Sequence, residues 1–100
     1  MGRTPTYNKG NGKDHWSIGS ILFIGPGMKG NRVLGETDDG QFAIPLDPKT
    51  MLANREKGIR VRPEHIHEAL RQYAGISSHA YSEKFPLGVK SEELLQGFWG

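Results

Sequence analysis

Two neighbouring residues, Asp14 and His15, carry the side chains best suited to chemistry in this sequence. A carboxylate and an imidazole together suit a divalent metal ion such as zinc. The pair lies between a glycine-rich stretch and an apolar run, and functional groups of α/β proteins gather where loops meet strand ends. Because zinc sites use three or four protein ligands, the pair is also consistent with an Asx turn at Asp14 and a solvated imidazole at His15.

A second candidate is Arg3, whose planar guanidinium can bind two oxygens of a phosphate or sulfate group. The alternative is an arginine exposed to solvent. The other histidines suggest no further ligand set, because His65 and His67 are two positions apart on an expected helix and face different sides. His79 follows two serines and has no ligand partner near it in the sequence. We expect these three histidines to be structural or solvated.

The composition narrows the classes of protein. The chain has 100 residues and no cysteine, which excludes disulfide scaffolds, thiolate zinc sites and cysteine nucleophiles. Its net charge of +2 is too small to indicate a nucleic-acid partner. No apolar run approaches the roughly 18–20 residues that span a bilayer. Hydrophobic residues make up 35% of the chain, enough for a modest core, while 14 glycines indicate many turns.

Strands and loops are expected to position the candidate side chains. Residues 1–13 are polar and glycine-rich, which predicts a loop that leaves Asp14 and His15 mobile. The apolar run at 18–24 predicts a short strand buried on both faces. Residues 32–44 predict a β-hairpin that turns at an Asp-Gly pair, since that pair supports the positive φ of tight hairpins.

The helix predicted at 63–74 has the clearest local signals. Pro63 suits the first helical position, and Gly75 suits the position just after the last turn. Apolar residues between them recur at helical spacing, so we expect one buried face. That face would hold Ile66, Leu70 and Tyr73, with His65, His67 and Arg71 outward. A further helix is expected at 91–96, with Ser91 as its N-cap.

These elements do not form a complete sheet protein by themselves. A strand buried on both faces needs neighbouring strands and cover on two sides. One hairpin and one clear helix fall short of that need. We therefore expect some of the partner elements to lie in sequence outside residues 1–100.

The first sixteen residues carry a pattern that resembles a known family. Gly2-Arg3-Thr4-Pro5, Asn8 and Gly12-Lys13-Asp14-His15-Trp16 are similar to the bacterial domain-of-unknown-function 1501 family, which is sulfatase-like. Lys13 stands where that family more often has arginine. Weaker similarity runs over nearly all the rest of the chain, through Ile21 to Gly25, Gly27 to Gly30, Arg62-Pro63-Glu64 and Tyr73-Ala74-Gly75-Ile76.

The resemblance implies membership of the alkaline phosphatase superfamily, with a parallel-rich α/β sheet and a metal-centred site for phosphate or sulfate esters. By this resemblance Asp14 and His15 are metal ligands, with zinc as the expected ion, and Arg3 orients the anion. The other ligands and the nucleophile would lie upstream, so the resemblance makes residues 1–100 the C-terminal segment of a single larger α/β domain, completed by a missing N-terminal part. We therefore expect the chain alone to be inactive. The parent would be a periplasmic or exported hydrolase, and its partner a small-molecule phosphate or sulfate ester.

A non-catalytic binding or structural module is the competing interpretation. A loose basic run could contact an acidic partner, although such a run is more often a solvated face. The run consists of Arg55, Lys57, Arg60 and Arg62. The reading frame upstream of Met1 separates the two interpretations, because the hydrolase parent requires a Glu directly before Met1 and further Asp and His ligands.

Overall fold

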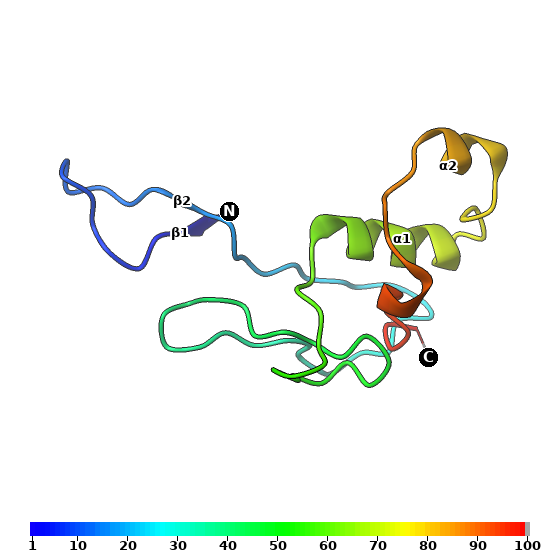
Figure 1. The fold of residues 1–100 in the computed structure, drawn as a ribbon, viewed down its shortest axis with the longest axis horizontal. Helices are drawn as coiled ribbons and strands as arrows, with labels where there is room; N and C mark the ends of the chain where they lie inside the picture. Colours follow the sequence, from blue (N-terminus) through cyan, green and yellow to red (C-terminus); the bar gives the residue numbers. More distant parts are fainter. Residues whose placement is uncertain (100) are drawn as a thin grey trace.

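The computed structural model describes residues 1–99 and combines one small sheet with short helices (Figure 1). Strands β1 (Gly2–Arg3) and β2 (His15–Trp16) form a two-stranded antiparallel sheet. Helices α1 (Pro63–Tyr73) and α2 (Ala80–Lys84) follow later, and the 3-10 helix η1 (Ser91–Glu93) lies near the C-terminus. The fold is therefore mixed α/β, as the sequence predicted. No helix within residues 1–99 is long and apolar enough to cross a membrane.

Residues 1–16 form a hairpin arm that projects from the rest of the chain along its long direction (Figure 1). The chain measures 48 × 29 × 28 Å along its principal axes. The register of the arm pairs Gly2 with Trp16 and Arg3 with His15. The sequence predicted a loop for residues 1–13, because polar residues and glycines carry no strand periodicity. Pairing occurs there because the turn between the strands is held by side-chain hydrogen bonds, described below.

The core lies in residues 25–99, which we call the body. Its buried apolar side chains come from the centre of the chain, from α1 and from the C-terminal segment. They are Leu46, Met51, Ala69, Leu95 and Phe98. Half-buried apolar side chains surround them, namely Phe23, Met28, Leu34, Ile59, Ile66 and Trp99. Closure of this core therefore depends on contacts between residues far apart in the sequence.

The apolar run at 18–24 is not a buried strand in this structure, contrary to the sequence prediction. Ile21, Leu22 and Ile24 are 66%, 82% and 88% exposed. Phe23 alone of these four reaches the core, where its ring centroid lies 5.5 Å from that of Phe98. Within residues 1–99, the backbone of residues 17–24 forms no hydrogen bond. The prediction failed because, within residues 1–99, no strand pairs with the run.

A second hairpin forms where the sequence predicted one, but it is short. Thr37 pairs with Ala43 as an isolated antiparallel bridge. Asp38 holds the turn, since its Oδ1 accepts hydrogen bonds from two backbone N–H groups of the turn at 2.9 and 3.0 Å. Positive φ falls at Gln41 (62°) and not at the predicted Asp-Gly pair. The turn therefore has three residues and a bulge, in which Gln41 takes the left-handed conformation.

Leu46 connects the centre of the body. Its N–H donates to Ile59 O at 2.9 Å, and its C=O accepts from Ile59 N–H at 2.8 Å. It also pairs with Ala53, so one residue joins two passing segments. Gly58 lies so close to these segments that an added Cβ would overlap the backbone oxygen of Asn54. This position therefore needs glycine, because any side chain would collide with the neighbouring backbone.

α1 begins and ends where the sequence predicted. Pro63 occupies the first position, which has no intrahelical partner for an N–H. At the other end Gly75 has φ 71°. Its N–H donates to Gln72 O at 3.1 Å, and Ile76 N–H donates to Arg71 O at 3.0 Å. These two bonds form a Schellman motif, in which glycine takes the left-handed conformation without strain.

The buried face of α1 differs from the predicted one. His65 and Ala69 are 2% and 3% exposed, whereas Leu70 and Tyr73 are 40% and 49% exposed. His65 can be buried because its Nδ1 accepts the Arg62 N–H at 2.9 Å. Hydrophobic spacing could not reveal this bond, so it assigned the histidine to solvent and the leucine to the core.

The C-terminal segment closes the body. The helix expected at 91–96 is a single 3-10 turn, η1, and its N-cap is Lys90 and not Ser91. Glu93 Oε2 accepts the Lys90 N–H at 3.2 Å, which satisfies a backbone donor at the helix start. Further on, the Trp99 ring stacks on Tyr73 with 4.3 Å between centroids. The last residues described thus pack on the far end of α1.

Candidate functional site

Arg3 and His15 are partners across the two strands of the arm. The next pair along is joined by a hydrogen bond from Thr4 N–H to Asp14 O at 3.0 Å. Arg3 and His15 therefore form a non-hydrogen-bonded pair, the kind in which the two opposite side chains lie closest. Both side chains are exposed. The arm thus presents a guanidinium and an imidazole on one face.

The Asn8 side chain organises the turn of the arm. Its Oδ1 accepts from the N–H groups of Gly10 and Gly12 at 2.9 and 3.0 Å, and its Nδ2 donates to Asp14 Oδ1 at 3.0 Å. Thr4 Oγ1 accepts the Asp14 N–H at 3.1 Å. Asp14 is therefore held at both its backbone and its carboxylate. The expectation that nothing local holds this residue is wrong.

Strand geometry separates the two candidate metal ligands. Successive residues of a strand point to opposite faces, so Asp14 lies on the face of Thr4 and His15 on the face of Arg3. The chain from 1 to 99 contains no group of three or more His, Asp or Glu side chains that could hold a metal ion. Each donor type fits zinc, but side chains on opposite faces do not close on one ion, and together they would fill only half of a tetrahedral set. Zinc at this pair therefore needs ligands from outside these residues.

Arg3 uses a small part of its hydrogen-bonding capacity inside the arm. Its Nη1 donates to Lys13 O at 3.3 Å. A guanidinium carries five N–H donors in a planar fork, so most of them face solvent. Lys13 adds a second cation nearby, with Nζ 5.2 Å from the centre of the Tyr7 ring. This side of the arm is positively charged and can accept an anion.

Trp16 joins the arm to the body. Its Nε1 donates to Gln41 O at 2.9 Å, and its ring meets that of Phe42 edge-on with 5.3 Å between centroids. Sequence reasoning missed this junction because Gln41 and Phe42 lie far from Trp16 along the chain. An aromatic residue directly after the candidate ligands was the available signal. The junction borders a hollow of about 220 Å³ lined by Trp16, Ser17, Ile18, Phe42, Ala43 and Arg60.

The model of a protein family matches residues 1–80, a range that includes the arm, the second hairpin and α1. That family is described as "Protein of unknown function (DUF1501)". The chain belongs to this family. The resemblance noted in the sequence is thereby confirmed at the level of the family. Comparison with curated proteins and with solved structures found no match to the chain.

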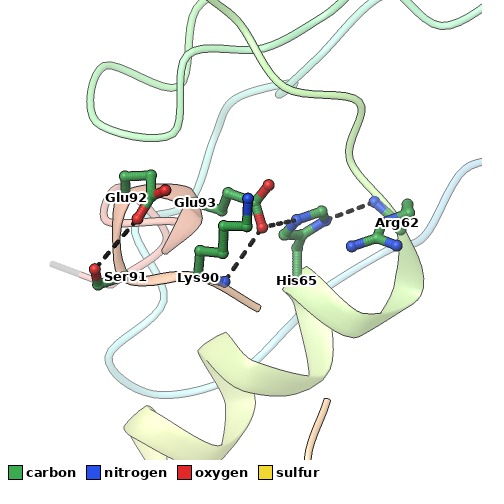
Figure 2. A network of polar contacts seen from close by, with 6 residues as sticks. All are labelled: Arg62, His65, Lys90, Ser91, Glu92 and Glu93. Carbon is green, nitrogen blue, oxygen red and sulfur yellow. Dashed lines mark hydrogen bonds and ion pairs between the residues drawn. The ribbon is translucent and has the colours of Figure 1, made fainter. Parts of the chain in front are cut away.

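Outside the arm, this DUF1501 chain buries one histidine in a polar network (Figure 2). His65 Nδ1 accepts the Arg62 N–H, and its Nε2 lies 3.6 Å from Glu93 Oε2. The backbone N–H of Lys90 lowers the pKa of Glu93 most, and the neighbouring His65 side chain lowers it further, against an opposing effect of desolvation. The network ties η1 to the start of α1. This is a structural role, one of the two expected for this histidine, although the sequence placed its side chain outward.

The remaining predicted surface groups also lie away from the arm's ligand pair. His79 caps α2, with its Nδ1 accepting the Tyr81 N–H at 3.1 Å, and His67 is exposed. Every side chain of the basic run is exposed to solvent. Within residues 1–99 none of its members forms an ion pair, and all four are exposed: Arg55, Lys57, Arg60 and Arg62.

Proposed function

We propose that this chain is the C-terminal portion of a sulfatase-like, metal-dependent hydrolase of phosphate or sulfate esters. Its alkaline-phosphatase-like sheet would be completed by the N-terminal part of the same domain. Asp14 and His15 would be metal ligands, and Arg3 would orient the ester anion. The observation that supports this best is the arm, where an ordered carboxylate and a guanidinium–imidazole pair lie within one hairpin.

Asn8 prepares Asp14 for a cation. Its Nδ2 donates to Asp14 Oδ1 at 3.0 Å, which orients the carboxylate and leaves Oδ2 free for another partner. Carboxylates that bind metals are commonly held by such hydrogen bonds, and loss of the supporting group weakens the metal site. Asn8 is therefore a positioning residue in the proposed site.

Arg3 and His15 prepare the other face for the substrate. The free edge of the guanidinium can bind two oxygens of a phosphate or sulfate group at once. The neighbouring imidazole can serve as a metal ligand through one ring nitrogen. A bound zinc ion would supply Lewis acidity and lower the pKa of a bound water or nucleophile.

The chain alone lacks the parts that such a reaction needs. It offers two ligands, and the nucleophile and remaining ligands would come from the rest of the domain. A displacement of about 1 Å in a reacting group can cost on the order of a hundredfold in rate. We therefore expect no hydrolysis of aryl phosphate or aryl sulfate by the isolated chain above the rate with zinc alone.

Calorimetric titration of the chain with zinc tests the ligand assignment. Binding should be weak, and it should weaken further in Asp14→Asn and His15→Gln. Matched changes at exposed residues outside the arm, Asp39→Asn and His67→Gln, should leave it unchanged. Tight stoichiometric binding that persists in Asp14→Ala would contradict the assignment.

A non-catalytic module with a basic surface is the second candidate. Its support is the exposure of four cations without ion pairs within residues 1–99. In that case the chain should bind a polyglutamate peptide, with an affinity that falls steeply between low and physiological salt. Arg55→Ala and Arg60→Ala should reduce that binding, whereas Asp14→Asn should not. Absence of salt-dependent binding would remove this candidate.

A further inference from the structure

The chain exposes more surface than a folded protein of its mass. Its accessible surface is 7689 Å², whereas a folded monomer of 11.1 kDa exposes about 5,700 Å². The excess of about 2,000 Å² is larger than the roughly 800 Å² that one partner buries in a standard specific interface. The chain therefore presents enough surface for an extensive, permanent contact.

Residues 17–24 form the most apolar part of this surface. In an extended chain Leu22 and Ile24 point to one side, while Ile21 and Phe23 point to the other. Phe23 reaches the core of the body, so its side of the segment is partly covered. The side of Leu22 and Ile24 is bare, at 82% and 88% exposure. A partner must therefore cover that side.

The backbone of this segment shows what kind of partner is needed. No N–H or C=O group of residues 17–24 is paired by another backbone group within residues 1–99. Buried backbone groups must find partners, and in a sheet those partners lie at both edges of a strand. A two-fold contact with a second copy brings one strand to one edge. Two separate strands, one at each edge, satisfy the whole segment.

We propose that residues 17–24 form an inner strand of a larger sheet, inserted between two strands of the remaining polypeptide of the same domain. This occupant rests on the proposed function, in which the chain is the C-terminal portion of that domain. In such strand addition the main-chain hydrogen bonds give affinity, and alternate side chains give the fit. The neighbouring elements must place aliphatic side chains over Leu22 and Ile24.

Hydrogen exchange followed by mass spectrometry tests the proposal. This chain is expressed alone, and also together with the polypeptide encoded directly upstream in the same reading frame. Alone, the amides of residues 17–24 should exchange at the rate of an unstructured peptide. In the complex they should be protected by on the order of a hundredfold or more, as in other internal strands.

Two variants distinguish the contribution of backbone hydrogen bonds to the complex from the contribution of apolar side chains. Ser20→Pro removes one N–H of the segment and should weaken the complex by about tenfold, whereas Ser20→Ala should not. Leu22→Lys places a charge on the bare side and should weaken it at least as much. Val33→Lys changes another residue that is 91% exposed and lies outside the segment. It should bind like the wild type.

Several results would overturn the inference. They are protection of residues 17–24 in the isolated monomer, lack of protection in the complex, a homodimer that protects the segment, or a stop codon directly upstream. Activity gives an independent readout. If the complex protects the segment but hydrolyses no ester, the strand proposal stands and the proposed hydrolase function is contradicted. If the complex hydrolyses an ester but leaves the segment unprotected, the hydrolase function stands and the strand proposal is contradicted.

Discussion

Arg3 lies directly across the arm from His15, while Asp14 lies on the opposite face, hydrogen-bonded to Asn8 and Thr4. The hairpin therefore separates a cationic side from a carboxylate side within a few residues. A metal ion at Asp14 would approach the arm from one side, whereas an anion at Arg3 or a metal ion at His15 would approach it from the other. The rest of a complete site would have to reach both faces.

The cationic face should bind inorganic phosphate weakly. In a titration followed by NMR, the side-chain signals of Arg3 and His15 should shift together, and the side-chain signals of Asn8 and Asp14 should shift little. Arg3→Lys should weaken binding, because an ammonium cannot make the two-pronged contact of a guanidinium. Equal shifts on both faces, or unchanged binding in Arg3→Lys, would show that phosphate meets the arm without a defined site.

Gly2 is expected to be indispensable for the arm. A Cβ built on Gly2 would overlap the backbone oxygen of Ile18, so the base of the hairpin has to move. Gly2→Ala should destabilise the arm by about 1–3 kcal/mol, measured as lost hydrogen-exchange protection at the Thr4 amide. Gly25→Ala is the control, because a Cβ there meets nothing within 4 Å. Equal protection in both variants would contradict the close approach.

Asn8 can be tested by two replacements that keep different parts of its network. Asn8→Ala removes the acceptor for Gly10 and Gly12 and should cost about 1–3 kcal/mol of turn stability, seen as faster exchange of those two amides. Asn8→Asp keeps the acceptor but replaces the donor to Asp14 by a second carboxylate. It should retain protection of the glycine amides and increase the mobility of Asp14, measured by NMR relaxation.

The contact between η1 and α1 should depend on pH. The pKa of Glu93 lies below its ordinary value of 4.5, chiefly because the Lys90 N–H stabilises the charged carboxylate. Its contribution to stability is therefore fully present above pH 4.5 and is lost as the pH falls through the lowered pKa. Denaturant unfolding should show this loss in the wild type and a smaller one in Glu93→Gln. The neighbouring Glu92→Gln should behave like the wild type.

Two leucines should differ strongly in their contribution to the body. Leu95 is 3% exposed, and Leu95→Ala should lower the free energy of unfolding by about 2–5 kcal/mol. Leu70 is 40% exposed, so Leu70→Ala should cost about 1 kcal/mol or less. Chemical denaturation measures both values. A larger cost at Leu70 would indicate that Leu70 is buried, as hydrophobic spacing predicts.

Features that depend on neighbouring residues could be predicted from the sequence. Pro63 and Gly75 marked the ends of α1 because each acts on the backbone next to it. The second hairpin was found for the same reason, although its positive φ moved to Gln41. The candidate residues Arg3, Asp14 and His15 could likewise be identified from the chemistry of their side chains. Their distribution over two faces was not, because it follows from the strand register.

Features that depend on distant contacts could not be predicted. His65 is buried because η1 packs beside it and its Nδ1 accepts the Arg62 N–H, and neither fact leaves a hydrophobic signal. The run at 18–24 has the composition of a buried strand, but burial requires neighbouring strands that residues 1–99 do not place there. Composition describes what a segment can bury, while partners decide whether it does so.

The two tryptophans of this chain occupy two different joints. Trp16 fastens the arm to the second hairpin, and Trp99 stacks on Tyr73 at the end of α1. Because indole emission responds to its immediate surroundings, Trp99→Phe leaves an optical reporter at the first joint and Trp16→Phe leaves one at the second. Each single-tryptophan variant would then follow one joint, so detachment of the arm and opening of the C-terminal segment can be timed separately.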